Sequence, residues 1–254
     1  MGTLIALANQ KGGVGKTTTA INISACLGKE GYKTLLIDLD PQGNATQGLG
    51  FDKSQLNGTV YTILSGDHSL SSIIKPTSYP NLYLAPSNRE LAGAEVELIE
   101  VDSREYKLKE KVSPIKNNFD FIIIDCPPAL SLLTVNGLVC AEKVIVPLQC
   151  EYYALEGLGE LLQTVLRIRD NFNSNLKILG IVLTMFQHTN LSRQVESDVR
   201  THFEHIVFKT VIPRNVTLSE APSYGKPVIY YDEKSSGAIA YAQLTREILD
   251  REFR

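Results

Sequence analysis

The chain has 254 residues, of which 43% are hydrophobic and 21% charged, and its formal net charge is −3. This balance is typical of a globular domain, and it excludes both a disordered chain and a protein that is basic all over. No apolar run is long enough to span a membrane, and the chain opens on a predicted strand, so we expect a cytoplasmic protein without a signal peptide. The four cysteines form no Cys-x-x-Cys pair, which favours a reducing compartment.

Strands and helices are predicted to alternate along the chain. A strand over residues 3–8 leads through a glycine-rich loop into a helix over residues 18–29. Further strands are expected at 33–39, 82–86, 119–125, 143–148, 176–185 and 207–212. Further helices are expected at 90–100, 105–116, 132–141, 154–170, 191–203 and 235–252. Strands that are apolar on both faces, such as residues 121–124, are typical of a parallel sheet between helices. We therefore predict one α/β domain over residues 1–254, with a mostly parallel sheet and helices on both faces.

The loop after the first strand carries the strongest signal for function. Residues 10–17 read Gln-Lys-Gly-Gly-Val-Gly-Lys-Thr, close to the phosphate-binding pattern Gly-x4-Gly-Lys-Ser/Thr. Lys16 is expected to neutralise the β and γ phosphates, and the Thr17 hydroxyl to bind Mg²⁺, while the loop amides hold phosphate oxygens. Gln10 replaces the usual first glycine, and Lys11 is an additional lysine that an ordinary loop does not need. The alternative, a glycine-rich turn that binds nothing, is disfavoured by the strand–loop–helix context.

Aspartates stand where two predicted strands end. Asp40 is followed by Pro41 and a polar turn, and Asp125 closes an apolar strand. Because ligands bind beyond the carboxyl ends of parallel strands, both carboxylates are expected beside the loop, with Asp125 on the Mg²⁺ side. The alternative for each is a surface aspartate in a turn. Asp38 either supports the site from behind or packs against the helix after the loop.

Three segments together resemble the deviant Walker A ATPases, a branch of the P-loop NTPases: residues 11–17, residues 38–44 (Asp-Leu-Asp-Pro-Gln-Gly-Asn) and residues 124–128 (Ile-Asp-Cys-Pro-Pro). Within that group, residues 146–157 and 211–222 are most similar to the ParA/Soj chromosome and plasmid partition proteins. The resemblance covers nearly the whole chain. It implies slow ATP hydrolysis with Mg²⁺, an ATP-bound homodimer, non-specific binding to double-stranded DNA, a ParB-like centromere-binding partner and a nucleoid-associated location without membrane binding.

The resemblance also implies roles for individual residues. Lys11 would reach the phosphates of the partner subunit in a nucleotide-sandwich dimer, like an arginine finger supplied in trans. Asp40 would position the attacking water, and Asp125 would hold Mg²⁺ through water. Pro213 and Asn215 match positions that contact adenine. The implied catalytic residues are Lys11, Lys16 and Asp40, and the implied nucleotide contacts in the loop are Lys11, Gly12, Gly13, Val14, Gly15, Lys16, Thr17 and Thr18.

Basic residues of the C-terminal third are the candidate DNA contacts. Acidic residues are interspersed among them, so a solvated surface of mixed charge is an equal alternative. Family members often carry arginine where this chain has Thr217, and a basic residue in the turn at 184–190, so the DNA surface is either built from other residues or weaker. The candidates are Arg193, Arg200, Lys209, Arg214 and Lys226.

Other functions within the same superfamily were weighed. A MinD-like division-site ATPase would bind membrane through a basic amphipathic tail, but residues 240–254 carry mixed charges. A protein like the nitrogenase iron protein would need cluster-binding cysteines from two subunits, and only Cys126 falls near the nucleotide side. A metal-cluster carrier is disfavoured by the missing Cys-x-x-Cys pair. The sequence leaves open the cargo, chromosome or plasmid, and the roles of Asp38 and Glu151.

Overall fold

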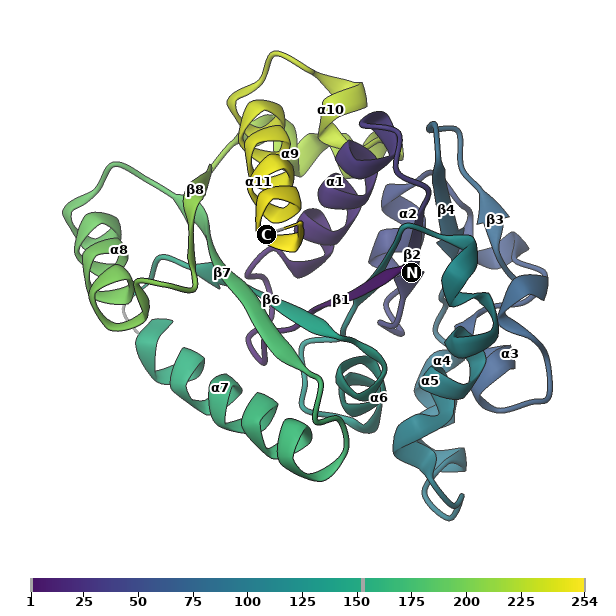
Figure 1. Cartoon of the computed structure of the whole chain (residues 1–254). Helices are drawn as coiled ribbons and strands as arrows, with labels where there is room; N and C mark the ends of the chain where they lie inside the picture. The colour runs from purple at the N-terminus through teal and green to yellow at the C-terminus, as the bar shows by residue number, and fades with distance from the viewer. Residues whose placement is uncertain (1, 152–153, 254) are drawn as a thin grey trace.

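One mixed sheet forms the middle layer of the computed structural model, which describes residues 2–151 and 154–253 (Figure 1). In spatial order its strands are β3 (Lys75–Pro76), β4 (Leu82–Ala85), β2 (Thr34–Asp38), β5 (Phe121–Asp125), β1 (Thr3–Leu7), β6 (Lys143–Gln149), β7 (Lys177–Phe186) and β8 (Val207–Pro213). Neighbouring strands run parallel, except that β3 is antiparallel to β4. The predicted class, a mostly parallel α/β sheet, is confirmed.

Helices cover both faces of the sheet, and each face has its own hydrophobic core. On one face, α1 (Lys16–Lys29), α10 (Val228–Tyr231) and α11 (Ser236–Glu252) bury side chains such as Ile23 and Tyr241 against the central strands. On the other face lie α3 (Val60–Leu64), α4 (Leu91–Glu97), α5 (Lys107–Val112), α6 (Leu132–Cys140), α7 (Ala154–Asn171) and α8 (Asn190–Phe203). Strands buried from both sides explain why the central strands read as continuous apolar runs.

Some elements differ from the sequence prediction. The short strand β3 and the short helices α2 (Asn44–Gly48), α3, α9 (Val216–Glu220) and α10 were not predicted. The helix expected at 90–100 ends at Glu97, and the one expected at 105–116 is reduced to α5 between two 3-10 turns. Pro114 lies at the start of the second turn, where its missing N–H and its ring disfavour a continuous α-helix. Within residues 2–151 and 154–253, no helix is both long and apolar enough to cross a bilayer.

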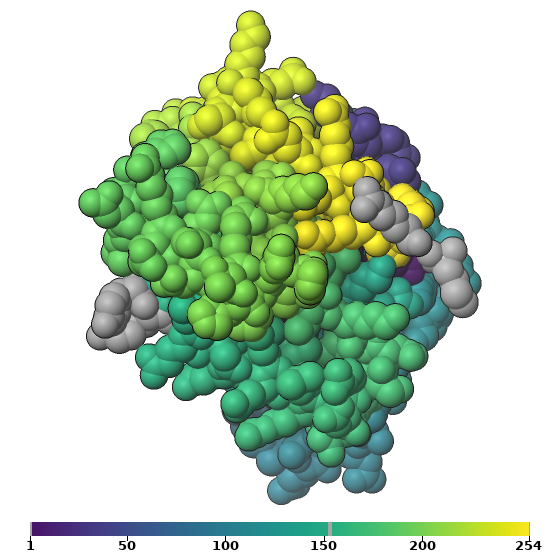
Figure 2. All heavy atoms as spheres, turned by 60° about the vertical axis from the view of Figure 1, so that its left-hand side comes forward, coloured from purple at the N-terminus to yellow at the C-terminus, as the bar shows by residue number. Residues whose placement is uncertain are grey.

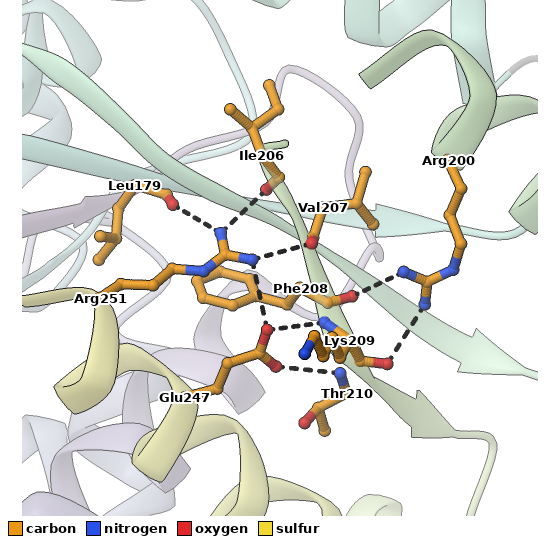
Figure 3. Close-up of polar contacts among 9 residues, drawn as sticks. All are labelled: Leu179, Arg200, Ile206, Val207, Phe208, Lys209, Thr210, Glu247 and Arg251. Atoms are coloured by element: carbon orange, nitrogen blue, oxygen red, sulfur yellow. Dashed lines mark hydrogen bonds and ion pairs between the residues drawn. The ribbon is translucent and has the colours of Figure 1, made fainter. Parts of the chain in front are cut away.

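The edge strand β8 is irregular, and charged side chains satisfy its backbone (Figure 3). Its pairing with β7 skips residues between Val207 and Val211. Glu247 accepts hydrogen bonds from the amides of Lys209 (2.8 Å) and Thr210 (3.0 Å). Arg251 of the same helix donates to the carbonyls of Leu179, Ile206 and Val207, and its guanidinium lies 4.0 Å from the centre of the Phe208 ring. These bonds fasten α11 to the sheet edge and leave the edge strand few free groups for pairing with another chain.

Replacing Glu247 by Ala should lower the free energy of unfolding by about 1–3 kcal/mol, because two backbone amides of β8 lose their acceptor. Urea denaturation followed by circular dichroism measures this loss. Arg246→Ala is the matched control, since Arg246 is a neighbour on α11 with a largely exposed side chain. A Glu247→Ala variant as stable as the control would contradict the role of Glu247 in holding the strand.

Candidate functional site

The strand register brings three strand ends to one point. Leu7 at the end of β1 is level with Asp125 at the end of β5, and Asp125 is level with Asp38 at the end of β2. Because these strands are adjacent and parallel, the segments that follow them leave the sheet at the same edge. The glycine-rich loop and the two aspartate-bearing segments therefore meet at the carboxyl edge, where open α/β sheets bind ligands.

The loop between β1 and α1 is shaped to expose backbone amides. Gly13 and Gly15 have φ angles of 75° and 86°, which is left-handed backbone that favours glycine. Gly15 is the N-cap of α1, and no side chain caps the helix and no acidic residue lies in its first turn. The first amides of α1 are thus left for an anion, which the helix dipole also favours. From the far side, the Thr184 hydroxyl of β7 fastens the loop by donating to the Val14 carbonyl (2.9 Å).

Lys16 is folded into the loop. It is only 6% exposed, and its ammonium donates to the Lys11 carbonyl at 3.0 Å. Burial lowers the pKa of Lys16, whereas the Asp125 and Asp40 carboxylates raise it. A buried ammonium with donors to spare at the centre of a loop of amides is suited to hold phosphate oxygens.

Lys11 behaves differently from Lys16, although the two lie five positions apart. The Lys11 side chain is half exposed and forms an ion pair with Glu151, which follows β6. Its amide donates to the Asn9 side chain (3.0 Å), whose own amide group donates to the Pro147 carbonyl (2.7 Å). The backbone of Lys11 is therefore held in place, while its ammonium lies at the surface, away from the loop centre.

Asp125 is the most conspicuous carboxylate of the site. It is fully buried, and neither of its oxygens has a hydrogen-bond partner within the described part of the chain. Burial and the neighbouring Asp38 raise the pKa of Asp125, whereas Thr17 and Lys16 lower it. Unpaired buried carboxylate oxygens call for a cation. Together with the Thr17 hydroxyl, this donor set fits Mg²⁺, which prefers oxygen ligands and keeps several waters.

Asp38 is the last residue of β2, and Asp40 lies in the turn that follows. Asp40 is 7% exposed, and one of its carboxylate oxygens accepts from the Gln42 amide at 2.8 Å. Asp38 is fully buried and accepts hydrogen bonds from both the amide and the hydroxyl of Thr46 on α2. Burial raises the pKa of Asp38 to about 6, although these hydrogen bonds oppose the shift. Asp38 thus has an internal structural partner, while Asp40 retains a carboxylate oxygen for the site.

A pocket of about 390 Å³ opens beside the end of the loop that leads into α1. Gly15 and Thr18 form one side, and the segment after β8, including Arg214 and Asn215, forms another. Asn215 caps α9 by accepting from the Leu218 amide (3.2 Å) and donates to the Ser236 hydroxyl (2.8 Å). Pro213, two residues before Asn215 at the end of β8, is half-buried. A pocket adjoining the phosphate-binding amides is where the nucleoside of a bound nucleotide belongs.

The five candidate DNA contacts do not share one environment. Figure 2 shows α8, β8 (green) and the C-terminal helices (yellow) on one continuous face. Arg193, Lys209, Arg214 and Lys226 are exposed. Arg200 is half-buried, pairs with Glu196 and donates to the Phe208 and Lys209 carbonyls (Figure 3). Each nitrogen of the Arg200 guanidinium thus donates within the protein, which favours a structural role; its contact with DNA stays a prediction.

The support around the loop was not predicted from the sequence. Asn9, Thr46 and Thr184 all make buried hydrogen bonds that fix the loop or the Asp38 turn. Asn9 follows β1 closely and Thr184 lies near the end of β7, and those positions were the local signals available, whereas Thr46 lies within α2. Taken together, a phosphate loop with a second lysine and two strand-end aspartates at the edge of a parallel sheet defines a P-loop nucleotide-binding protein of the deviant Walker A type.

Comparison with known proteins gives the family. The AAA domain family matches residues 2–178. The sporulation initiation inhibitor protein Soj of Bacillus subtilis is 53% identical over 249 residues, 98% of each chain. The chromosome partitioning protein ParA of Myxococcus xanthus is 48% identical over 99% of this chain and 89% of its own. A solved structure called cobyrinic acid a,c-diamide synthase, from Mycobacterium smegmatis with bound ADP and magnesium, is 40% identical, with a TM-score of 0.88 over 100% of this chain and 96% of that one. The chain belongs to the ParA/Soj family of chromosome-partitioning proteins.

Lys16→Ala should reduce nucleotide affinity by about a hundredfold or more, because the buried ammonium at the loop centre is lost. Titration with a fluorescent ADP analogue in the presence of Mg²⁺ measures the change. Lys29→Ala, at the far end of α1, removes the same charge outside the site and should leave the affinity unchanged. Tight nucleotide binding by Lys16→Ala would refute the assignment of the loop.

Proposed function

We propose that this protein is a partition ATPase: it binds ATP with Mg²⁺, dimerises, binds DNA without sequence preference and resets by slow hydrolysis. The observation that carries the proposal is the buried Asp125, with both oxygens unpaired among the described residues and with Thr17 and Lys16 near enough to lower its pKa. A divalent cation would compensate this carboxylate, and Lys16 with the loop amides would bind the phosphates that accompany the cation. The chromosome partitioning protein ParA of Myxococcus xanthus, at 48% identity, supports the same function.

Hydrolysis would rest on positioning and charge neutralisation. Lys16 and the loop amides hold the β and γ phosphates, and the Asp40 carboxylate orients the attacking water. The Thr17 hydroxyl and Asp125 would hold Mg²⁺, which would supply further positive charge beside the phosphates. No arginine lies within the loop, so a subunit on its own lacks the extra cation that accelerates phosphoryl transfer in related enzymes. Slow turnover is suited to setting how long the ATP-bound state lasts rather than to metabolic catalysis.

Lys11 is proposed to supply that missing cation to the partner subunit. Its ammonium lies at the surface and pairs with the half-exposed Glu151. An ion pair between exposed groups contributes about 0–1 kcal/mol, so leaving Glu151 costs little. Lys11 is thus able to turn toward the phosphates of a second copy, and ATP would then join the two subunits. A ParB-like centromere-binding protein would act on this dimer by stimulating hydrolysis.

DNA is favoured over membrane as the surface that the dimer binds. The apolar face of α11, including Tyr241 and Leu244, is buried in the core shared with α1. This apolar face of α11 is therefore not available to a bilayer, although Ile239 and Phe253 are exposed, whereas a MinD-like ATPase would carry an amphipathic tail. The chain as a whole is acidic, so one subunit offers few clustered cations. Joining two subunits would double the exposed basic residues along the face of α8 and β8 and favour DNA phosphates.

Lys11→Ala should bind nucleotide as tightly as the wild type but fail to dimerise with ATP, because its contact is made across the interface. Light scattering with ATP, with ADP and without nucleotide separates the two steps. Lys53→Ala is the control, since the Lys53 ammonium only bonds the Gln42 carbonyl on the surface. If Lys11→Ala forms the ATP dimer like the wild type, the sandwich proposal fails.

Asp40→Ala should retain ATP binding and trap the dimer, because only the water-positioning carboxylate is removed.

The DNA affinity of this trapped dimer should fall steeply with salt, with a log–log slope of about −0.9 per phosphate neutralised. Arg193→Glu in the same background should weaken DNA binding several-fold without changing dimerisation. Arg169→Glu is the matched control, because Arg169 is exposed at the opposite end of the sheet, near the start of β7. Tight binding by the nucleotide-free monomer, or no salt dependence, would sink the proposal.

A further inference from the structure

The peptide groups on both sides of Asp40 are held by buried side chains. The Asp40 amide donates to the Asp38 carboxylate at 3.3 Å. The Asp40 carbonyl accepts from the Ser87 hydroxyl at 2.8 Å and from the Gly43 amide at 2.9 Å. The backbone of Asp40 is therefore fixed at its donor and at its acceptor, unlike an ordinary exposed turn.

Thr46 closes these contacts into a ring. Its amide (2.8 Å) and hydroxyl (2.7 Å) both donate to Asp38, and the hydroxyl accepts from the Ser87 amide at 2.9 Å. Asp38, Thr46 and Ser87 are fully buried. Starting from Asp40, the ring passes through Asp38, Thr46 and Ser87 and returns to Asp40. Networks of this kind stabilise a single conformation when every member is satisfied.

The ring joins three elements at the carboxyl edge of the sheet. Asp38 ends β2, Thr46 lies in α2, and Ser87 follows β4, the neighbour of β2. The turn between Asp40 and α2 fits closely under Ser87: Gly43 has a φ of 61°, and a Cβ there would lie 2.8 Å from the Ser87 carbonyl. The Asp40 turn is thus located relative to two adjacent strands.

Thr46 and Ser87 lie next to the site without lining it. Neither lines the pocket of Gly15 and Asn215 or the neighbouring pocket of about 370 Å³ formed by Thr17, Thr18 and α2. Both hydroxyls are used inside the ring, and the Thr46 hydroxyl acts as donor and acceptor at once. Their removal would leave the phosphate-binding groups untouched and would loosen only the backbone that carries Asp40.

We propose that Thr46 and Ser87 are positioning residues for ATP hydrolysis, which hold the Asp40 carboxylate where it orients the attacking water. The inference rests on the role proposed for Asp40. Misplacing a catalytic group by about 1 Å can cost about a hundredfold in rate. Loosening the ring without deleting Asp40 should therefore slow hydrolysis while the ground state of bound ATP is unchanged.

The main test compares Thr46→Val with Thr46→Ser. Thr46→Val keeps the side-chain shape but removes the hydroxyl, and it should lower kcat about tenfold, with ADP affinity within about twofold of wild type and a longer-lived ATP dimer. Thr46→Ser restores the hydroxyl and should recover most of kcat. Thr245→Val is the matched control: Thr245 is also buried, its hydroxyl bonds the Tyr241 carbonyl on α11, and it lies away from the site. Thermal unfolding of each variant separates loss of fold from loss of rate.

Ser87→Ala provides an independent arm, because it removes one hydrogen bond and leaves Thr46 in place should Thr46→Val fail to fold. A several-fold loss of kcat with unchanged ADP affinity is expected. If Asp40→Ala stops hydrolysis while Ser87→Ala and Thr46→Val retain wild-type kcat, the positioning inference is wrong and the role of Asp40 stands. The inference is also overturned if Thr46→Ser is as slow as Thr46→Val. If Asp40→Ala hydrolyses at the wild-type rate, the proposed role of Asp40 falls and the inference with it.

Discussion

Buried charge at the carboxyl edge of the sheet is the constraint on which the rest of this structure depends. Asp38, Asp40 and Asp125 are each at most 7% exposed, and Lys16 at 6% is the buried ammonium among them. Carboxylates withdrawn from water are costly unless cations or hydrogen-bond donors compensate them. Asp38 is compensated by Thr46, but Asp125 has no such partner within the described residues. A divalent cation would compensate Asp125, and the phosphates bound with it would pair with Lys16 and the loop amides, so ligand binding would stabilise this edge.

Irregular backbone in this protein is secured by side chains rather than left to solvent. The Asp40 turn is held by Asp38, Thr46 and Ser87, and the irregular strand β8 by Glu247, Arg251 and Arg200 (Figure 3). β8 leads directly to Asn215 and the pocket beside the loop. Both walls of the site therefore depend on polar groups that belong to distant parts of the chain, and the two hydrophobic cores keep those parts in register.

Two lysines of one loop show how burial divides their roles. Lys16 is enclosed by the loop and faces the carboxylates, whereas Lys11 is at the surface with Glu151. An enclosed ammonium is suited to bind a ligand of its own subunit. A surface ammonium on a fixed backbone would be available to a second subunit, as proposed above, and the chemistry of the site would then depend on assembly. That dependence would make ATP a signal for dimerisation as well as a substrate.

The sequence by itself determined the parallel α/β class, the phosphate loop and the aspartates at the strand ends, because apolar periodicity and the spacing of glycine, lysine and aspartate are local properties. Only the tertiary structure decided how these residues are supported. Ser87 lies 41 residues from Thr46, and Thr184 lies 170 residues from Val14, so no local sequence pattern predicts their hydrogen bonds. Arg200 is a further example: it remains a candidate nucleic-acid contact, but its guanidinium also donates to the Phe208 and Lys209 carbonyls of the irregular strand β8, a contact that the sequence did not indicate. Partners of buried polar groups are selected by the packing of strands and helices, and packing is settled only when the whole chain is folded.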